Sequence, residues 1–333
     1  MNRELLKVAI QPLRDAGYNG GVAELHGAID EVFHHSALLQ LAFPFETLPD
    51  IAALKQVYTD LYAAIPDLER RDTIVMAGEN SDGSQWVGCC GYYCGSFEAD
   101  WLDIPATGHM VSMRFHEFYR ISEGKVTELQ ALWDIPEVMI QANAWPMSPS
   151  LGREWHVPGP ATQDGLTITN HSDTHADESA TSVLNMCNAL GNYATGGVEA
   201  MRLNDYWHKR CSWYGPAGIG TARNIQNFRN WHQIPFLNGL PDRVGDAAKG
   251  YLLGDGDYVG FTAWPGMFMS VSGDGWLGIA PSGQKITMRS LDFWRCEGEL
   301  IRENWVLVDI LHVYHQLGVD VFKRLREFNK ARR

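Results

Sequence analysis

The sequence predicts an α+β fold of two tandem cone-shaped domains, each a strongly curved, mostly antiparallel sheet with helices packed over its concave face. The first observation is an internal repeat: residues 101–141 align with residues 276–316 at a constant offset of 175, without a gap, and 14 of 41 positions are identical. In both halves, segments with helical periodicity precede segments with strand-like alternation. A repeat this long indicates a duplicated domain rather than a solenoid of short units. A sheet with one apolar face has to bury that face, and the helices are its natural cover.

Length and charge limit the class of protein. The 333 residues suffice for two hydrophobic cores, and we divide them into a first domain (1–145), a linker (146–180) and a second domain (181–333). A net charge of −13 and a pI near 5.3 disfavour a nucleic-acid partner, which requires a basic face. No apolar run approaches the ~20 residues of a membrane span, and residues 1–15 are too polar for a signal peptide. We therefore expect a cytoplasmic protein with neither a membrane nor a nucleic-acid partner.

The first domain begins with residues 1–19, which we interpret as a short amphipathic or irregular lead-in. Apolar residues at spacings of three and four then predict helices over 22–35 and 51–65, with Thr47 as a candidate cap of the second helix. A short extended segment separates these helices. Four strands follow, at residues 70–79, 85–97, 109–120 and 125–134.

The linker is rich in Pro, Ser, Thr and Asn and shows no apolar periodicity. A helical pattern resumes near residue 179, and the order of elements in the first domain is then repeated. Residues 196–215 resemble residues 20–39, and we expect Thr221 to cap a helix as Thr47 does. Each domain thus consists of helix, short strand, helix and a run of antiparallel strands.

The most informative segment is a predicted hairpin over residues 286–309, with a Glu-Gly-Glu turn between its strands. Alternation places Trp305 and Asp309 on one face of its second strand. We expect this face to line the cavity of the cone, together with Asp292 on the preceding strand. The first domain retains acids at the two equivalent positions, Glu117 and Asp134.

A carboxylate on an apolar, aromatic wall has its pKa raised toward the range that is useful for proton transfer, unless it finds a partner. This reasoning makes Asp309 a candidate general base or acid, with Asp292 and His208 as partners or hydrogen-bond donors. The alternative for Asp309 is a strand-end residue that caps the following helix by accepting from its first amides. His208 is equally compatible with a hydrogen-bonded histidine at a helix end.

Other motifs point to no metal and no cofactor. His312 and His315 share a helix face, but no third ligand has a suitable spacing. The glycine-rich segment 215–220 lacks the parallel βαβ context of a nucleotide site. The six cysteines, three of them at Cys89, Cys90 and Cys94, are expected to be buried free thiols.

The hairpin and its lead-in, W-L-G-I-A-P-S-G…F-W-R…G-E-L-I-R-E-N-W-V-L-V-D, resemble the SnoaL-like polyketide (ester) cyclase family of the nuclear transport factor 2-like superfamily. Residues 101–134 resemble it as well. The resemblance implies an intramolecular aldol cyclisation of polyketide esters by an acid–base Asp near the end of the last strand, without a cofactor. That residue would be Asp309, or Asp134 in the first domain. Ketosteroid isomerase, of the same superfamily, also uses a protonated Asp that donates a hydrogen bond to the oxyanion. The strand position of Asp292 resembles the position of that donor.

Two functions follow from these observations. The first is an enzyme whose second domain performs cyclase- or isomerase-type acid–base chemistry on a small apolar or polyketide-like carbonyl compound. The residues expected to contact this substrate are Trp213, Tyr214, Trp264, Trp305 and His232. The second is a non-catalytic module that binds a small ligand or serves as a scaffold. In either case the chain is an internal pseudo-dimer, which lessens the need for a homodimer without excluding one.

Overall fold

The computed structural model describes residues 2–168, 172–245 and 250–332, and the chain divides into two compact units. The first unit consists of Met1–Pro146, Ala161–Leu166 and Asp320–Arg333, and the second unit of Met147–Pro160 and Thr167–Val319. The segment interpreted as a linker is thus divided between the units. The last residues of the chain, which we assigned to the second domain, pack within the first unit.

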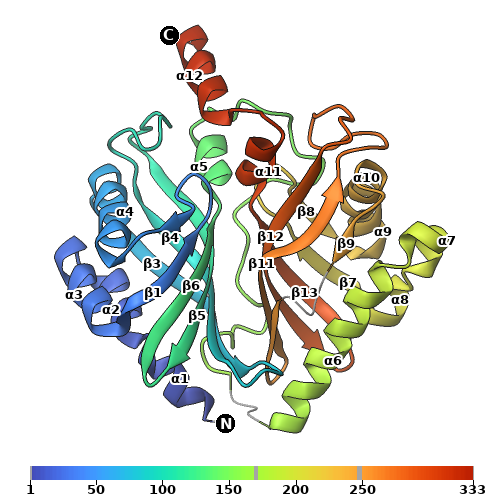
Figure 1. Ribbon diagram of the computed structural model, residues 1–333, viewed down its shortest axis with the longest axis horizontal. Helices are drawn as coiled ribbons and strands as arrows, with labels where there is room; N and C mark the ends of the chain where they lie inside the picture. Colours follow the sequence, from blue (N-terminus) through green and yellow to red (C-terminus); the bar gives the residue numbers. More distant parts are fainter. Residues whose placement is uncertain (1, 169–171, 246–249, 333) are drawn as a thin grey trace. The chain divides into compact units, whose positions relative to one another are not determined.

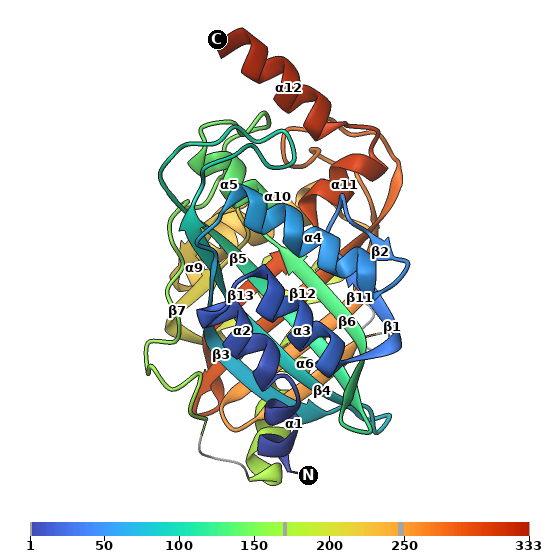
Figure 2. The ribbon, with the colours of Figure 1, turned by 90° about the vertical axis from the view of Figure 1, so that its left-hand side faces the viewer.

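The first unit is built on one six-stranded sheet, and the four helices within residues 3–64 lie along one face of that sheet (Figures 1 and 2). Its strands are β1 (Phe33–Leu41), β2 (Thr47–Leu48), β3 (Glu69–Glu79), β4 (Gln85–Ser96), β5 (Met110–Ser122) and β6 (Lys125–Trp133). Its helices are α1 (Arg3–Ala9), α2 (Gln11–Asn19), α3 (Val22–Val32), α4 (Ile51–Ala64), α5 (Ile135–Gln141) and α12 (Val321–Arg332). The strand order is β2-β1-β6-β5-β4-β3, with β1 and β6 parallel and the other neighbours antiparallel.

Local signals explain most of these elements. Helix α4 begins after Asp50, whose Oδ1 accepts a hydrogen bond from the Ala53 amide at 2.8 Å. Thr47, our predicted cap, lies instead in β2, so that prediction is wrong. The lead-in before residue 20 is not irregular, because it forms α1 and α2. Helix α4 ends one residue before Ile65-Pro66, as the sequence predicts.

The second unit repeats this plan around a seven-stranded sheet of order β10-β11-β12-β13-β7-β8, with β9 paired to β11. Its strands are β7 (Trp207–Tyr214), β8 (Thr221–Arg223), β9 (Val244–Gly245), β10 (Tyr251–Asp255), β11 (Tyr258–Ser270), β12 (Lys285–Glu297) and β13 (Leu300–Val308). Its helical elements are α6 (Asp173–Leu190), α7 (Tyr193–Ala200), α8 (Leu203–Tyr206), α9 (Asn224–Phe228), the π-helix η1 (Arg229–Gln233), α10 (Ile234–Gly239) and α11 (Ile310–Gln316). The predicted α+β class with two sheets and covering helices is confirmed.

Two boundaries in the second unit differ from the sequence prediction. Helix α6 begins at Asp173 rather than near residue 179, because the Ser172 hydroxyl accepts from the His175 amide and caps the helix. Thr221 belongs to strand β8 and caps no helix, so its predicted role is wrong.

The internal repeat extends to the pairing of the strands. Phe115 pairs with Trp133 in the first unit, and Ser290 pairs with Val308 in the second, which reproduces the offset of 175. The sheets differ at one edge, where the single strand β3 corresponds to the two short strands β9 and β10. Strand β11 also contains a register shift between Ala263 and Met267. This edge borders the cavity of the second unit.

All six cysteines are free, and the five that are buried confirm the prediction of buried thiols. No helix in the described ranges is long and apolar enough to cross a membrane.

Candidate functional site

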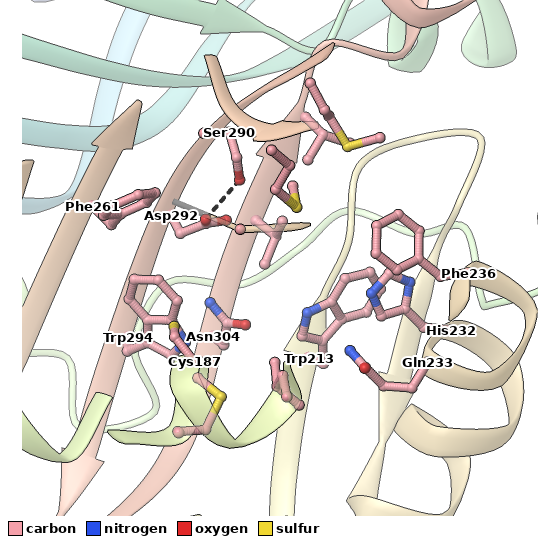
Figure 3. A pocket seen from close by; sticks show the side chains of 18 of the residues that line it. Cys187, Trp213, His232, Gln233, Phe236, Phe261, Ser290, Asp292, Trp294 and Asn304 are labelled. Atoms are coloured by element: carbon pink, nitrogen blue, oxygen red, sulfur yellow. Dashed lines mark hydrogen bonds between the residues drawn. The ribbon is translucent and has the colours of Figure 1, made fainter. Parts of the chain in front are cut away.

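The second unit encloses a cavity of about 190 Å³ between one face of its sheet and helices α6, α9, η1 and α10 (Figure 3). Most of the wall is apolar, and the lining includes a few polar side chains. These are Asn188, His232, Gln233, Arg243, Ser290, Asp292 and Asn304. Because an engineered cavity of about 150 Å³ holds benzene, this cavity has room for a compound of roughly one substituted ring.

The register of β12 against β13 determines which residues face this cavity. Asp292 pairs with Val306, and Phe293 pairs with Trp305. Directly paired residues lie on the same face of a sheet, so Asp292 and Val306 face the cavity while Trp305 faces away. The prediction that Trp305 and Asp292 face the same space is therefore wrong. Alternation defines the faces within one strand, but a change of register by one residue exchanges the faces between strands.

Asp292 is the buried acid of the cavity, with 7% of its surface exposed. Its Oδ2 accepts a hydrogen bond from the Ser290 hydroxyl at 2.7 Å, and its Oδ1 has no hydrogen-bond partner among the described residues. Burial raises the pKa of Asp292 to about 7, against the smaller lowering effect of the Ser290 hydrogen bond. The carboxyl group is therefore present in both protonation states near neutral pH.

Three buried N–H groups on residues that line the cavity also lack a hydrogen-bond partner in the described part of the chain. Within residues 2–168, 172–245 and 250–332, no acceptor is hydrogen-bonded to Nε1 of Trp207, Nε1 of Trp294 or Nε of Arg243. We call these three donors and Asp292 Oδ1 the open polar atoms, because each lacks a hydrogen-bond partner within the described structure although its own surface is buried. A buried polar atom left unsatisfied costs about 1–3 kcal/mol.

His232 lies across the cavity from Asp292 (Figure 3). Its ring stacks on Trp213 at 3.8 Å between centroids and also packs against Phe236. Burial, and to a smaller extent the charge of Arg243, lowers the pKa of His232 to about 3, which keeps the imidazole neutral. The π-helix η1 carries His232 and Gln233, and π-helical turns of this kind are frequent at functional sites.

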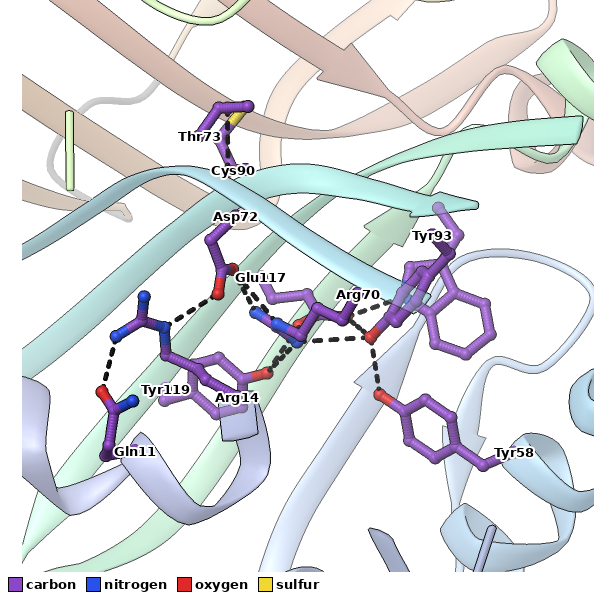
Figure 4. A network of polar contacts seen from close by, with 11 residues as sticks. Gln11, Arg14, Tyr58, Arg70, Asp72, Thr73, Cys90, Tyr93, Glu117 and Tyr119 are labelled. Atoms are coloured by element: carbon purple, nitrogen blue, oxygen red, sulfur yellow. Dashed lines mark hydrogen bonds and ion pairs between the residues drawn. The ribbon is translucent and has the colours of Figure 1, made fainter. Parts of the chain in front are cut away.

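The first unit has an acid at the position equivalent to Asp292, but its surroundings are different (Figure 4). Glu117 Oε2 lies 2.6 Å from Arg70 Nη1 and accepts from the Tyr119 hydroxyl at 2.5 Å. Its Oε1 accepts from the Tyr93 hydroxyl and from Trp133 Nε1, each at 2.9 Å. The space that Arg70, Tyr93 and Tyr119 line together is only about 10 Å³, and Glu117 does not line the open groove of about 530 Å³ on the other side of Arg70. This carboxylate is fully paired in a filled core.

The strand registers identify what replaces this network in the second unit. Arg70 pairs with Tyr93 across β3 and β4, and the equivalent pair is Gly245 and Met267. The repeat offset places Trp294 at the position of Tyr119 and Val308 at the position of Trp133. Replacement of the arginine by glycine removes both the counter-ion and the side chain that fills the space. The cavity and the open oxygen of Asp292 have this common origin.

The sequence also matches a known family across both units. Residues 8–142 and 266–317 match the SnoaL-like polyketide cyclases, and these segments make up more than half of the chain. The chain belongs to the SnoaL-like polyketide cyclase family. The resemblance inferred from the hairpin is thus confirmed, and Asp292 lies within the second matched segment.

Several solved structures resemble one SnoaL-like unit of this chain. IdmH from Streptomyces antibioticus, provisionally assigned as a polyketide cyclase, is 16% identical, with 41% of this chain and 96% of IdmH covered at a TM-score of 0.35. AclR from Streptomyces galilaeus, provisionally assigned as a hydroxylase, is 18% identical, with 41% and 94% covered at a TM-score of 0.35. A provisionally assigned polyketide cyclase from Acidithiobacillus ferrooxidans is 20% identical, with 43% and 96% covered at the same TM-score. The search of curated proteins finds no match.

Asp309, the residue that the resemblance selected, lies outside the cavity of the second SnoaL-like unit. Its Oδ1 accepts from the His312 amide at 3.1 Å and so caps α11, and its Oδ2 lies 3.1 Å from Arg289 Nη1. This contact set matches the helix-capping alternative stated above. In the first unit, Asp134 precedes α5 and lies 3.8 Å from Arg114 Nη2.

Four further predicted residues do not line the cavity. His208 Nδ1 accepts from the Arg210 amide, and the Tyr214 hydroxyl donates to Glu303. The Trp264 ring lies 4.5 Å from the Arg289 guanidinium, and Trp305 Nε1 donates to the Pro158 carbonyl. The positions predicted for these side chains in the substrate pocket are therefore wrong. Trp213 and His232 do line the cavity, and their contact with a substrate stays a prediction.

Sequence reasoning missed three residues of this site. Ser290 and Trp294 lie on the same face of β12 as Asp292, but the sequence prediction concentrated on the face of β13 that carries Trp305 and Asp309. Arg243 was missed because it lies outside the ungapped repeat, so no comparison between the two halves singled it out. Within the described residues, no group of three or more His, Cys, Asp or Glu side chains is arranged to hold a metal ion.

Proposed function

We propose that the second SnoaL-like unit is an enzyme that transfers a proton next to the carbonyl group of a small apolar compound, in a cyclase-type reaction without a cofactor. Asp292 is its acid–base residue. The observation that carries this proposal is a buried carboxyl group with an oxygen unpaired among the described residues, on a residue that lines a largely apolar cavity. A pKa near 7 suits a group that takes up a proton and returns it at neutral pH.

The reaction has two proton transfers at one residue. Ionised Asp292 removes a proton from the carbon next to the carbonyl, which leaves an enolate and a protonated Asp292. The enolate carbon then bonds to a second carbonyl carbon of the same molecule, and the resulting alkoxide takes the proton back from Asp292. The reaction closes a ring and consumes no other reagent.

Developing negative charge on the enolate oxygen needs hydrogen-bond donors in a site that excludes water. The indole N–H of Trp294 is one of the open polar atoms, and the neutral imidazole of His232 offers a second donor from the opposite wall. Both groups are neutral before the reaction, so they do not lower the pKa of Asp292 as a permanent cation beside it would. This property distinguishes the second unit from the first, where Arg70 contacts the equivalent acid.

We assign no chemistry to the first unit. Glu117 is committed to Arg70, two tyrosines and a tryptophan, and no space of substrate size adjoins it in the described structure. Substrate size in the second unit follows from its volume, which corresponds to roughly one substituted ring.

Proton removal can be tested without knowledge of the natural product. Alicyclic and aryl ketones of about one ring are incubated with the protein in D₂O, and deuterium incorporation next to the carbonyl is followed by NMR. We expect catalysed exchange in the wild type and a loss of about 10²–10⁴-fold in Asp292→Asn. Undiminished exchange in this variant contradicts the proposed role, and binding without exchange in the wild type favours a ligand-binding module.

Asp309→Asn is the matched control. Asparagine caps a helix about as well as aspartate, so α11 keeps its N-terminal hydrogen bond. The variant also loses the ion pair with Arg289, so its folding is checked by circular dichroism before exchange is compared. We expect exchange in this variant to remain within a few-fold of the wild type. Loss of exchange in Asp309→Asn, with retention in Asp292→Asn, would transfer the acid–base role to Asp309.

A further inference from the structure

Arg243 is a half-buried cation on the wall of the cavity, and its contacts are weak. Nη2 donates to the Leu190 carbonyl at 3.5 Å, Nη1 lies 4.0 Å from Met267 Sδ, and the guanidinium carbon lies 5.6 Å from the centre of the Phe236 ring. Its Nε is one of the open polar atoms. A guanidinium group has five N–H donors in a planar fork, so most of its hydrogen-bonding capacity is unused.

Three buried arginines of this protein each contact a carboxylate. Arg70 contacts Glu117 at 2.6 Å, Arg289 contacts Asp309 at 3.1 Å, and Arg295 contacts Glu303 at 2.7 Å. No carboxylate in the part of the chain that the structure describes pairs with Arg243. Buried charges are generally paired, so the exception at the cavity wall requires an explanation.

The acid of the cavity does not provide this pair. The hydrogen-bond partner of Asp292 is Ser290, and burial rather than a nearby cation dominates its electrostatic environment. Cys187 lies within electrostatic reach of both charges: burial first, and then Asp292, raises the pKa of its thiol to about 12, and Arg243 opposes this effect. The cavity thus carries an acid and a cation at separate places, and the charges of both affect the thiol of Cys187.

Burial lowers the pKa of Arg243, which reflects the unfavourable transfer of its charge out of water. An anionic ligand group would relieve this penalty and would also accept from the planar fork in two places. Carboxylate is the group whose geometry fits that fork, and it is compatible with an otherwise apolar ring.

We propose that the ligand of this cavity is a carbonyl compound of about one ring that carries a carboxylate, and that this carboxylate pairs with Arg243. The inference rests on the proposed function, because it assumes that the carbonyl end of the same ligand lies at Asp292. Arg243 is then a specificity-determining residue, which selects acids over neutral compounds of equal shape.

The test uses two probes of nearly equal shape, 4-acetylbenzoate and its neutral analogue 4-acetylbenzamide. Their dissociation constants are measured by calorimetry with the wild type, Arg243→Met and Arg243→Lys. We expect the wild type to prefer the benzoate by about 10–100-fold, which corresponds to a charge-assisted hydrogen-bonded pair. Arg243→Met should abolish this preference and leave benzamide affinity nearly unchanged, and Arg243→Lys should retain part of it.

The inference is overturned if the wild type binds both probes with equal affinity or binds neither. It is also overturned if Arg243→Met loses affinity for the two probes to the same extent. If Arg243→Met fails to fold, as judged by circular dichroism, the comparison of probes in the wild type and in Arg243→Lys decides the question. The experiment is repeated with Asp292→Asn. If the wild type prefers the benzoate but catalyses no deuterium exchange, the pairing of a carboxylate with Arg243 stands and the proposed function is rejected. If the wild type catalyses exchange but shows no preference for the benzoate, the proposed function stands and the pairing with Arg243 is rejected.

Discussion

Replacement of Asp292 by Asn should stabilise the second unit above neutral pH. The unfolded chain ionises this carboxyl near its usual pKa of 3.8, whereas burial raises the pKa of the folded state to about 7. The folded protein therefore holds a proton between these values that the unfolded chain has released. The contribution of the protonated group to stability is fully present below pH 4 and is lost as the pH rises through 7.

The magnitude follows from the two pKa values. They differ by about three, and a difference of one corresponds to about 1.4 kcal/mol, so ionisation at pH 8 costs up to about 4 kcal/mol. Asparagine has no charge to bury and its amide oxygen can still accept from the Ser290 hydroxyl. The variant should therefore exceed the wild type in free energy of unfolding by about 2–4 kcal/mol at pH 8 and by only about 1 kcal/mol at pH 4.5, where the unfolded chain is already largely ionised.

The assay is urea unfolding at pH 4.5, 6 and 8, with hydrogen-exchange mass spectrometry of β12 and β13 peptides to report on the second unit alone. Glu117→Gln is the matched control, read from β5 and β6 peptides. That substitution removes a paired carboxylate from Arg70, so it should destabilise the first unit by about 3–5 kcal/mol at pH 8. An Asp292→Asn variant that is no more stable than the wild type at pH 8, or whose advantage is independent of pH, refutes the reasoning.

Three further predictions concern the same cavity. The rate of deuterium exchange should rise with pH to a plateau, with a midpoint near 7 set by Asp292, and a flat profile would contradict its role as the base. Gly245→Arg should weaken binding of the acetyl probes at least tenfold and move that midpoint below 7, because the guanidinium would take the position of Arg70. Among the described residues, an added Cβ meets only Arg243 Nη1, at 3.8 Å. His232→Phe keeps the stacking on Trp213 but removes the ring nitrogens, so exchange should fall about tenfold with little change in melting temperature. An unchanged rate in this variant would exclude His232 as a donor.

The order of helices and strands could be predicted because it depends on local patterns. Apolar spacing located α3 and α4, and alternation located β3 to β6 and the β12–β13 hairpin. The register between strands is not local, since it depends on hydrogen bonds and bulges that single-strand alternation does not reveal. For this reason Trp305 was placed in the cavity when it lies on the opposite face.

The same limit affected the choice of the acid. Asp309 and Asp292 were both identified as acids that the duplication retained, and each was a reasonable candidate from spacing alone. Their contacts distinguish them: Asp309 accepts from a helix amide and pairs with Arg289, whereas Asp292 keeps one oxygen open. Arg243 lies outside the ungapped repeat, and the added residues near Trp264-Pro265 in β11 hide the correspondence between Gly245 and Arg70.

The two units together indicate how a duplicated domain can separate structural from chemical roles. Both keep an acid at the same place on the same strand, so the acid alone does not determine function. In the first unit a cation and three donors surround it and fill the core. In the second unit the cation is lost to glycine, two of the donors become Met267 and Val308, and the third becomes Trp294, whose N–H is an open polar atom. An acid that loses its partners in an enclosed space is destabilised when ionised, and that same penalty gives it the proton affinity that catalysis at neutral pH requires.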